Sequence, residues 1–284
     1  MEDKFMQKKI AVINDLSGYG RCSITAALPV AIPVLSAMGH QCCPIPTAIL
    51  SNHTEFPVYF FDDYTEKMTT YTDKWKELGL SFDAIATGFL GSEAQIGIVM
   101  EIVQKLKAEK TFVVVDPVMG DHGHAYETYT PEMCEQMKEL VCMADVVLPN
   151  VTECCILTDT PYREENWTRK ELLNMAMMLR LMGAKSVVIT GVREGSCYTN
   201  VVLEQGQYDA KFIRTRSSGG ERPGTGDVFS SVVAGALLTG KSLPEAVSQA
   251  AGFVKECIKV SDEEQIPHAN GVCFEKILGK LIKK

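Results

Sequence analysis

The 284-residue sequence lacks the features that mark nucleic-acid-binding, membrane and secreted proteins. It contains no run of three or more Lys or Arg residues, and its formal net charge is −8. Neither property suits binding to a polyanion or to an anionic membrane surface. No apolar run approaches the roughly 18 residues that a transmembrane helix needs. The charged start, Met1-Glu2-Asp3-Lys4, does not resemble a secretory signal. These absences predict a protein that binds neither nucleic acid nor membrane.

Two further absences limit the chemistry. None of the ten cysteines is spaced Cys-x-x-Cys, so neither a disulfide-rich scaffold nor a zinc site is indicated. Reduced thiols in a cytoplasmic protein are the expected state. The Gly-x-Gly-x-x-Gly fingerprint of nicotinamide-dependent dehydrogenases is also missing, because the stretch that begins at Gly18 carries Ser23 where the last glycine should stand. A dehydrogenase is therefore disfavoured.

The chain does contain a regular alternation of apolar strands and amphipathic helices. Strands are predicted at 10–13, 44–50, 56–61, 83–88, 112–115, 145–148 and 186–190, and an antiparallel pair at 197–203 and 207–214. Helices are predicted at 26–38, 63–78, 93–106, 131–142, 168–182, 227–239, 243–260 and 274–282. Continuously apolar strands between helices predict an α/β fold with a mostly parallel sheet covered on both faces. No linker divides the chain, so a single domain over residues 1–284 is expected.

Polar or small residues gather near or directly after the carboxyl ends of the predicted strands. They are Asp15, Thr47, Gly88, Asp116, Asn150 and Thr190. In an open α/β sheet the carboxyl ends of the parallel strands lie along one edge, and ligands bind there. The pattern therefore predicts a ligand site at that edge.

The stretch Arg222-Pro223-Gly224-Thr225-Gly226-Asp227 leads directly into an apolar helix. Its glycines allow a tight turn, and the helix start points free N–H groups and a positive dipole end at that turn. This combination predicts an anion site. Asp227, in its mouth, could accept the proton of an alcohol during phosphoryl transfer. The alternative is that Asp227 is an ordinary helix N-cap.

A second group of polar residues could serve a metal ion. Asn150 and Glu153 stand three apart at a predicted helix start, and with Asp116 they could hold Mg²⁺, mostly through water, and orient phosphates. The alternative is a capping box closed by Asn150 and Glu153.

Three further residues have two interpretations each. Thr190 could contact nucleotide phosphates or end its strand, and Arg222 could neutralise a phosphate or pair with a surface carboxylate. His53 could bind a ligand or be a loop histidine that bonds within the protein.

Five stretches, in this order, resemble the ribokinase superfamily and, within it, the pyridoxal (vitamin B6) kinases. They lie at residues 51–54, 87–92, 115–120, 149–153 and 223–227. The last three are typical of the superfamily, and the first two indicate the vitamin B6 branch. The resemblance extends from Ile10 to about Val260. It implies a ribokinase-like fold and an ATP-dependent kinase that phosphorylates the hydroxymethyl group of pyridoxal, pyridoxamine or pyridoxine.

The resemblance also implies a role for each matching residue. Asp227 would be the catalytic base. The anion hole would be formed by Gly224, Thr225 and Gly226. ATP and its phosphates would be bound by Asp116, Asn150, Glu153 and Thr190, with Asp116 and Glu153 as Mg²⁺ ligands. The substrate would be bound by Asp15, Thr47, His53 and Phe89, the last standing where these kinases often carry Tyr.

Asp15 departs from the family pattern. Pyridoxal kinases place a serine there, whereas the related hydroxymethylpyrimidine kinases place an aspartate. A carboxylate could accept a hydrogen bond from a protonated ring nitrogen or a substrate amine, or it could bond to the amides that follow it. The preferred substrate therefore stays open, and a hydroxymethylpyrimidine kinase of thiamine synthesis is the alternative function.

Three expectations complete the interpretation. A catalytically silent small-molecule sensor on the same fold is a further alternative, although the intact Asp227 and its glycine turn argue against it. The resemblance favours a homodimer, in which residues 56–76 could form the dimer face or shield the site. A monovalent cation such as K⁺ is a possible cofactor beside Mg²⁺.

Overall fold

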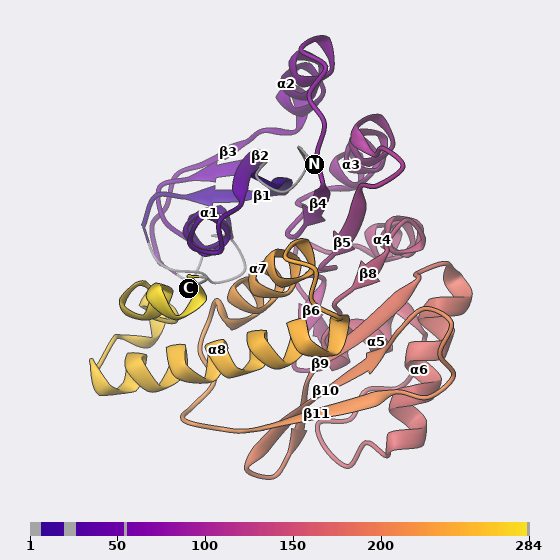
Figure 1. The fold of residues 1–284 in the computed structure, drawn as a ribbon, viewed down its shortest axis with the longest axis vertical. Coiled ribbons are helices and arrows are strands. Elements are labelled where there is room, and N and C mark those ends of the chain that lie inside the picture. Colours follow the sequence, from indigo (N-terminus) through magenta and orange to yellow (C-terminus); the bar gives the residue numbers. More distant parts are fainter. Residues whose placement is uncertain (1–6, 20–26, 54–55, 283–284) are drawn as a thin grey trace, which may run out of the picture.

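The computed structural model describes residues 7–19, 27–53 and 56–282, and these residues build one nine-stranded sheet beside a small hairpin (Figure 1). The strand order is β11-β10-β9-β8-β5-β4-β1-β2-β3. The strands are β1 (Lys9–Ser17), β2 (Gln41–Leu50), β3 (Phe61–Asp63), β4 (Ala84–Thr87), β5 (Phe112–Val115), β8 (Val146–Val147), β9 (Ser186–Glu194), β10 (Cys197–Leu203) and β11 (Lys211–Arg216). The central strands β2, β1, β4, β5, β8 and β9 run parallel, and only β3, β10 and β11 pair antiparallel. The predicted mostly parallel sheet is confirmed.

Helices cover both faces of the sheet (Figure 1). One face packs against α1 (Leu28–Ala37), α7 (Thr225–Leu238) and α8 (Leu243–Glu263). The other packs against α2 (Thr65–Glu77), α3 (Glu93–Leu106), α4 (Pro131–Cys142), α5 (Val151–Leu157) and α6 (Arg169–Met182). Alternate residues of β1 serve the two cores, because side chains alternate across a strand: Ile10 and Val12 face α1 and α7, while Ala11 and Ile13 face the opposite layer.

Several helix boundaries follow from local capping. The Ser92 hydroxyl accepts the Gln95 N–H at the start of α3, and Thr130 does the same for Met133 at the start of α4. The helices predicted at 93–106 and 131–142 are both confirmed at these bounds. None of the helices in the described ranges is long and apolar enough to cross a membrane.

Other boundaries differ from prediction. β3 lies at Phe61–Asp63 rather than at 56–61, and β9 continues to Glu194 because Gly191, at φ 67°, lets the strand pass an irregularity in its pairing with β10. The predicted last helix is a 3₁₀ helix, η2 (Glu275–Leu281). The hairpin of β6 (Gly120–Asp121) and β7 (His124–Ala125) was not predicted.

The nine cysteines within the described ranges form no disulfide with one another, and Cys142 is exposed. Residues 20–26, which include the end of the predicted strand-exit loop, and Thr54 lie outside the described residues.

The two glycines Gly183 and Gly252 should respond in opposite directions to substitution by alanine. Gly183 caps α6 at φ 137°, and a Cβ there would lie 3.0 Å from the Cβ of Cys142. Gly252 lies within α8, and a Cβ there meets nothing within 4 Å. We expect Gly183→Ala to lower the unfolding free energy by more than ~1 kcal/mol and Gly252→Ala to raise it by ~0.5–1 kcal/mol, measured by urea denaturation. Equal effects would contradict the assigned backbone geometry.

Candidate active site

The carboxyl edge of the sheet brings acidic side chains toward the start of α7. Asp15 lies near the end of β1, Asp116 follows β5, and Glu153 lies in the first turn of α5, which follows β8. Asp15 and Asp116 each feel the charge of Asp227 in α7, and Asp116 also feels that of Glu153. Residues separated by more than 200 positions therefore form one acidic site.

Helix α7 starts earlier than predicted. Its N-cap is Gly224 at φ 84°, a left-handed conformation that glycine adopts without strain, and Asp227 is the third helical residue. The interpretation of Asp227 as the N-cap is therefore wrong. The first helical turn, Thr225 to Asp227, carries amide N–H groups that have no acceptor within the helix. Its opening can therefore accept negative charge.

Arg222 holds the loop that precedes this turn. Its Nε and Nη2 donate to Oδ1 of Asp262 at 3.1 and 2.8 Å, and its Nη1 donates to the Ile266 carbonyl at 2.9 Å. Of the two alternatives for Arg222, the structure contains the carboxylate pair. The Thr225 hydroxyl in turn donates to the Arg222 carbonyl at 3.2 Å. Arg222 thus anchors the glycine turn from outside the site.

The surroundings of Asp116 disfavour the charged form of its carboxyl group. Loss of hydration, then the charge of Glu153, then that of Asp227, raises the pKa of its carboxyl well above the usual value. Hydrogen bonds from Ser230 and from the Val118 amide act in the opposite direction. Val118 stands at φ 34°, a strained conformation for a β-branched residue. Strain of this kind gathers at functional sites, and here it turns an amide toward Asp116.

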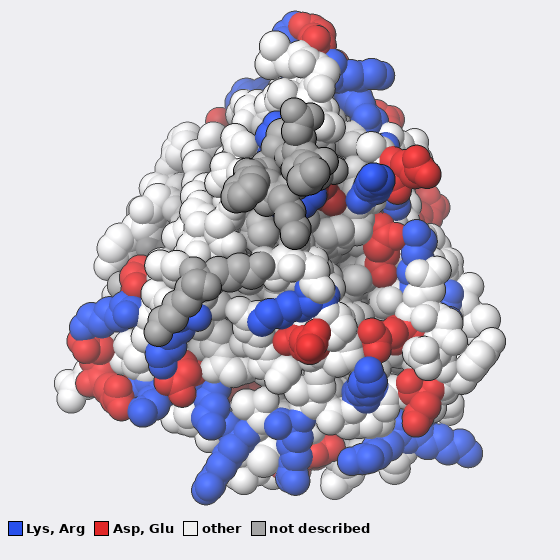
Figure 2. Space-filling model, in the orientation of Figure 1, with Lys and Arg blue, Asp and Glu red and all other residues white. Residues whose placement is uncertain are grey.

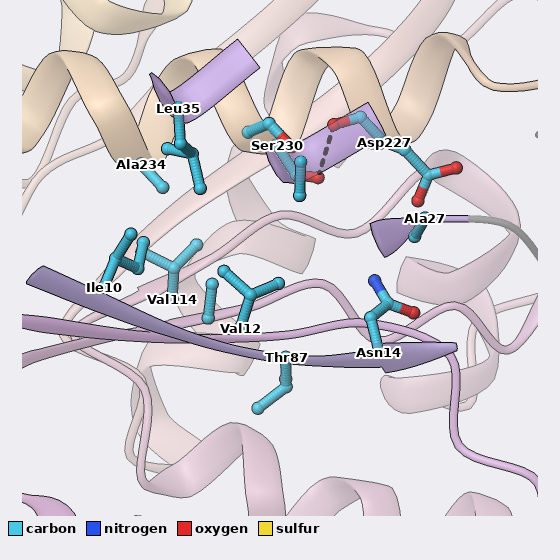
Figure 3. Close-up of a pocket in the computed structure, with 13 residues that line it drawn as sticks. Ile10, Val12, Asn14, Ala27, Leu35, Thr87, Val114, Asp227, Ser230 and Ala234 are labelled. Carbon is cyan, nitrogen blue, oxygen red and sulfur yellow. Dashed lines mark hydrogen bonds between the residues drawn. The ribbon is translucent and has the colours of Figure 1, made fainter. Parts of the chain in front are cut away.

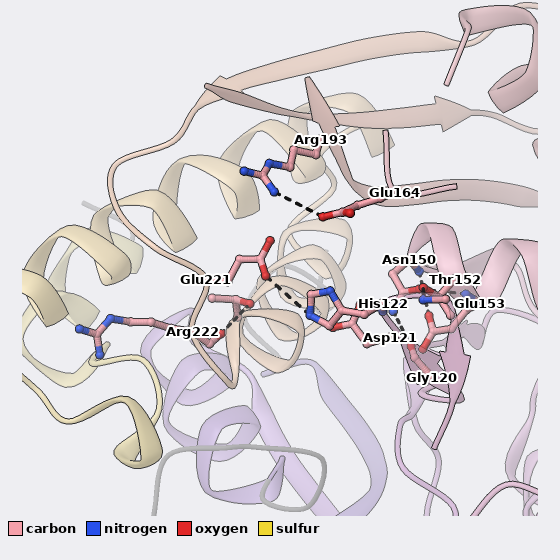
Figure 4. A network of polar contacts seen from close by, with 12 residues as sticks. Gly120, Asp121, His122, Asn150, Thr152, Glu153, Glu164, Arg193, Glu221 and Arg222 are labelled. Carbon is pink, nitrogen blue, oxygen red and sulfur yellow. Dashed lines mark hydrogen bonds and ion pairs between the residues drawn. The ribbon is translucent and has the colours of Figure 1, made fainter. Parts of the chain in front are cut away.

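Glu153 and Asn150 form the predicted capping box and also contact a neighbouring loop. Oε2 of Glu153 accepts from the Asn150 amide at 2.8 Å, and Oε1 accepts from the Met119 amide at 2.9 Å. The Asn150 Nδ2 donates to the Gly120 carbonyl at 2.9 Å (Figure 4). Burial still raises the pKa of Glu153 to about 7, despite these amide hydrogen bonds. Thr190 lies beside this box, because it forms a β-bridge with Asn150.

These carboxyls do not form a complete metal site by themselves. Within the described ranges, no three His, Cys, Asp or Glu side chains are grouped so that they could hold a metal ion. Mg²⁺ is usually held by one or two carboxylates together with water and substrate phosphates. Asp116 and Glu153 fit such an ion, because the charge of Glu153 raises the pKa of Asp116 and a cation would offset that charge; both oxygens of Glu153 already accept amides, so it would act mainly through water.

Asp15 is buried, and one of its oxygens has no partner. Its Oδ1 accepts from the Ala27 amide at 3.4 Å, whereas no hydrogen bond reaches its Oδ2 from the described part of the chain. Burial, followed by the charge of Asp227, raises the pKa of Asp15 well above its usual value. A buried carboxyl oxygen without a partner is costly unless a ligand completes it.

The other substrate-side candidates have partners within the protein. The Thr47 hydroxyl donates to the Phe89 carbonyl at 3.3 Å, which joins these two residues across the sheet edge. The buried His53 lies 2.6 Å, through Nε2, from the Ala269 carbonyl. This hydrogen bond matches the interpretation of His53 as a loop histidine that bonds within the protein.

Sequence reasoning missed two polar residues that organise this edge. Gln95 donates through Nε2 to the Thr47 carbonyl and the Thr65 hydroxyl, both at 2.9 Å. Asn14 lines a small cavity together with Asp227 (Figure 3). Asn14 directly precedes Asp15 at a strand exit, and that position was the available signal.

A loop contact closes one side of the site. His122, at the tip of the β6–β7 hairpin, lies 3.7 Å from Oδ2 of Asp121 and 3.7 Å from Oε2 of Glu221 (Figure 4). Glu221 belongs to the loop before α7, and its Oε1 accepts from the Tyr198 hydroxyl at 3.2 Å. The hairpin and the glycine turn are therefore joined across the site.

The raised carboxyl pKa values predict how stability depends on pH. Glu153 gains a proton more readily in the folded state, so its contribution is complete below the unfolded value of 4.5 and is lost as pH rises through about 7. Without nucleotide or metal, we expect the unfolding free energy to fall by ~1–3 kcal/mol between pH 5 and pH 7 in urea titrations. Asp116→Asn removes a second carboxyl whose pKa is raised, by burial and then by the charge of Glu153, and should show a smaller loss. Equal pH dependence in both proteins would contradict this account.

Comparison with known sequences identifies relatives along nearly the whole chain. A family model for phosphomethylpyrimidine kinase matches residues 32–273. The hydroxymethylpyrimidine/phosphomethylpyrimidine kinase of Aquifex aeolicus is 32% identical over 174 residues, which cover 61% of this chain and 66% of that protein. The pyridoxine kinase of Bacillus subtilis is 27% identical over 271 residues, which cover 90% and 85%.

Comparison with solved structures identifies the same family. A candidate phosphomethylpyrimidine kinase from Bacteroides thetaiotaomicron, crystallised in an orthorhombic form with pyridoxal, is 38% identical, with a TM-score of 0.90. The match covers 97% of this chain and 96% of that one. The family model covers far more than half of the chain and agrees with this structural match. The chain therefore belongs to the phosphomethylpyrimidine kinase family, within the ribokinase superfamily, and is an ATP-dependent small-molecule kinase.

Proposed function

We propose that this kinase transfers the γ-phosphoryl group of ATP to the hydroxymethyl group of a vitamin B6 compound, giving the 5′-phosphate. The observation that carries the proposal is the position of Asp227 in the first turn of α7, beside the Gly224–Gly226 amides and next to Asp116. Support for the substrate class comes from the pyridoxal in the similar Bacteroides thetaiotaomicron structure and from the similar Bacillus subtilis pyridoxine kinase.

In the proposed reaction, Asp227 accepts the proton of the substrate hydroxyl. The hydroxyl oxygen then attacks the γ-phosphorus, the bond from that phosphorus to the β–γ bridging oxygen breaks, and ADP leaves. The amides of Gly224, Thr225 and Gly226 stabilise the charge that develops on the transferred group. Preorganised donors of this kind contribute about 3–4 kcal/mol each at comparable sites.

Magnesium belongs to the proposal: Asp116 and Glu153 would hold it, mostly through water. When bound, it neutralises phosphate charge. Asn150 and Thr190, which are bridged to each other, would contact the nucleotide phosphates. A requirement for K⁺ stays a prediction.

On the substrate side, Asp15 is the proposed anchor of the ring. Its raised pKa and its unpartnered Oδ2 suit one shared proton between the carboxyl and a pyridine nitrogen. Thr47, His53 and Phe89 are the remaining proposed substrate residues, and stacking on the Phe89 ring, which is 5% exposed, would require the substrate to reach a buried face.

The same Asp15 supports one second candidate substrate. A carboxyl group can pair at once with a ring nitrogen and an adjacent amino group, and an aminopyrimidine offers both. Hydroxymethylpyrimidine is therefore the alternative substrate, in agreement with the similar Aquifex aeolicus enzyme.

Substitution of Asp227 tests the proposed chemistry. Asp227→Asn keeps the shape of the side chain but cannot accept the hydroxyl proton. We expect kcat for pyridoxal phosphorylation to fall at least ~100-fold, while the Kd for ATP changes less than ~3-fold, because the anion-binding amides remain. The exposed Asp209→Asn is the matched control and should retain wild-type turnover.

Two outcomes would contradict this chemistry. Retained turnover in Asp227→Asn would show that Asp227 is not the catalytic base. ATP binding without phosphoryl transfer by the wild type would favour a silent sensor.

We also propose that residues 1–284 form a single cytoplasmic domain that assembles as a homodimer. The edge strand β3 and the segment before it expose Val58, Tyr59, Phe60 and Phe61, which are 80, 45, 64 and 45% accessible. An exposed apolar row on an unpaired sheet edge is a typical association surface.

Phe60→Glu tests the dimer. A buried charge at the proposed interface should shift the protein to monomer in sedimentation-velocity runs at micromolar concentration. Tyr208→Glu changes an 81% exposed aromatic residue elsewhere and should leave the assembly unchanged. A Phe60→Glu protein that sediments as the wild type would refute this interface.

A further inference from the structure

Asn14 is held in one orientation in the carboxyl half of β1. It is 7% exposed, and its Oδ1 accepts the amide N–H of Asp15 at 3.1 Å and of Phe89 at 3.0 Å. Two N–H donors on one atom identify that atom as the oxygen, so the other terminal atom is the amide nitrogen. Gly88 packs against it, because a Cβ at Gly88 would lie 2.1 Å from Nδ2. The side chain has little room to turn.

The amide nitrogen of Asn14 points toward α7, and the Asp227 carboxylate points back toward the sheet (Figure 3). Both residues line a cavity of about 20 Å³ between the sheet and helices α1 and α7, together with Ser230, Ser231 and mostly apolar side chains. Within the described ranges, Nδ2 donates no hydrogen bond to a protein atom. A cavity of this volume holds one water molecule when two or more polar groups face it.

We propose that Asn14 is a positioning residue for Asp227, and that its amide donates through one water molecule in this cavity to the Asp227 carboxylate. The inference rests on the proposed role of Asp227 as the base. Nothing in the family motifs of the sequence assigns a role to Asn14.

The proposed contact would offset electrostatic repulsion around Asp227. Asp15 and Asp116 lie close enough to Asp227 for their charges to interact, so two neighbours of the base are acidic. A fixed donor on the sheet side offsets that repulsion and restricts the carboxylate to orientations that face the hydroxyl. Orientation of this kind affects kcat more than substrate binding.

Asn14→Asp removes the amide nitrogen. The variant keeps Oδ1 for the Asp15 and Phe89 amides, and its ionised carboxyl group accepts where the amide donated and adds a negative charge near Asp227. We expect kcat to fall at least ~10-fold while the KM for ATP changes less than ~3-fold. The control is Thr87→Val, which removes a hydroxyl on the opposite side of the sheet from Asp227 (Figure 3) that has no partner in the described chain, and it should keep the wild-type kcat.

A double-mutant cycle separates positioning from a structural effect. If Asn14 acts through Asp227, adding Asn14→Asp to Asp227→Asn should change kcat less than ~2-fold, because the base that it positions is gone. An undiminished loss in the Asp227→Asn background would overturn the inference. A wild-type kcat for Asn14→Asp in the otherwise native protein would overturn it as well.

Two further measurements distinguish failure of this inference from a folding defect and from failure of the proposed function. If Asn14→Asp does not fold, as judged by thermal unfolding, Gly88→Ala replaces it, since its Cβ displaces the Asn14 amide without changing its chemistry. That variant should show the same loss of kcat, and a normal kcat with a native melting curve would count against the inference. Retained turnover in Asp227→Asn alone would instead contradict the proposed function.

Discussion

Repulsion between carboxyl groups at the start of one helix is the interaction on which this site depends. Loss of hydration and the neighbouring charges raise the pKa of Asp15 and Asp116, and burial raises that of Glu153. The positive end of α7 lies in the same place, with the amides of its first turn open to an anion. A cation with phosphates between Asp116 and Glu153, and a substrate proton at Asp15, would relieve this repulsion. Binding of a cation and a substrate proton would therefore lower the electrostatic free energy of the site.

Two packed cores, one on each face of the sheet, hold the acidic groups in position. Alternate residues of β1 are buried against the two helical layers, so a shift of one residue would exchange the cores and is strongly disfavoured. This register fixes the positions of Asn14 and Asp15 in the carboxyl half of β1. Arg222, held by Asp262 and Ile266 from α8 and the segment after it, fixes the turn on the opposite side. The reacting groups are therefore carried by rigid elements rather than by the loops alone.

The sheet and much of the site could be predicted, because their signals are local. Ser92 and Pro131 mark helix starts within a few residues, and Asp116 and Asn150 directly follow apolar strands. The remainder depends on partners that are distant in sequence. The Arg222–Asp262 pair spans 40 positions and the Glu153–Met119 bond spans 34, and no local pattern encodes either of them. The donor role of Asn14 likewise requires Phe89, which is 75 residues away.

The most direct test of the central claim is ATP-dependent phosphorylation of pyridoxal, pyridoxamine, pyridoxine and hydroxymethylpyrimidine, compared under one condition with Mg²⁺. The account predicts that kcat/KM for at least one vitamin B6 compound exceeds that for the pyrimidine by tenfold or more, a difference of ~1.4 kcal/mol in transition-state binding. A preference for the pyrimidine would show that Asp15 selects an aminopyrimidine and would contradict the vitamin B6 assignment. Absence of transfer to all four compounds would contradict the kinase mechanism built on Asp227.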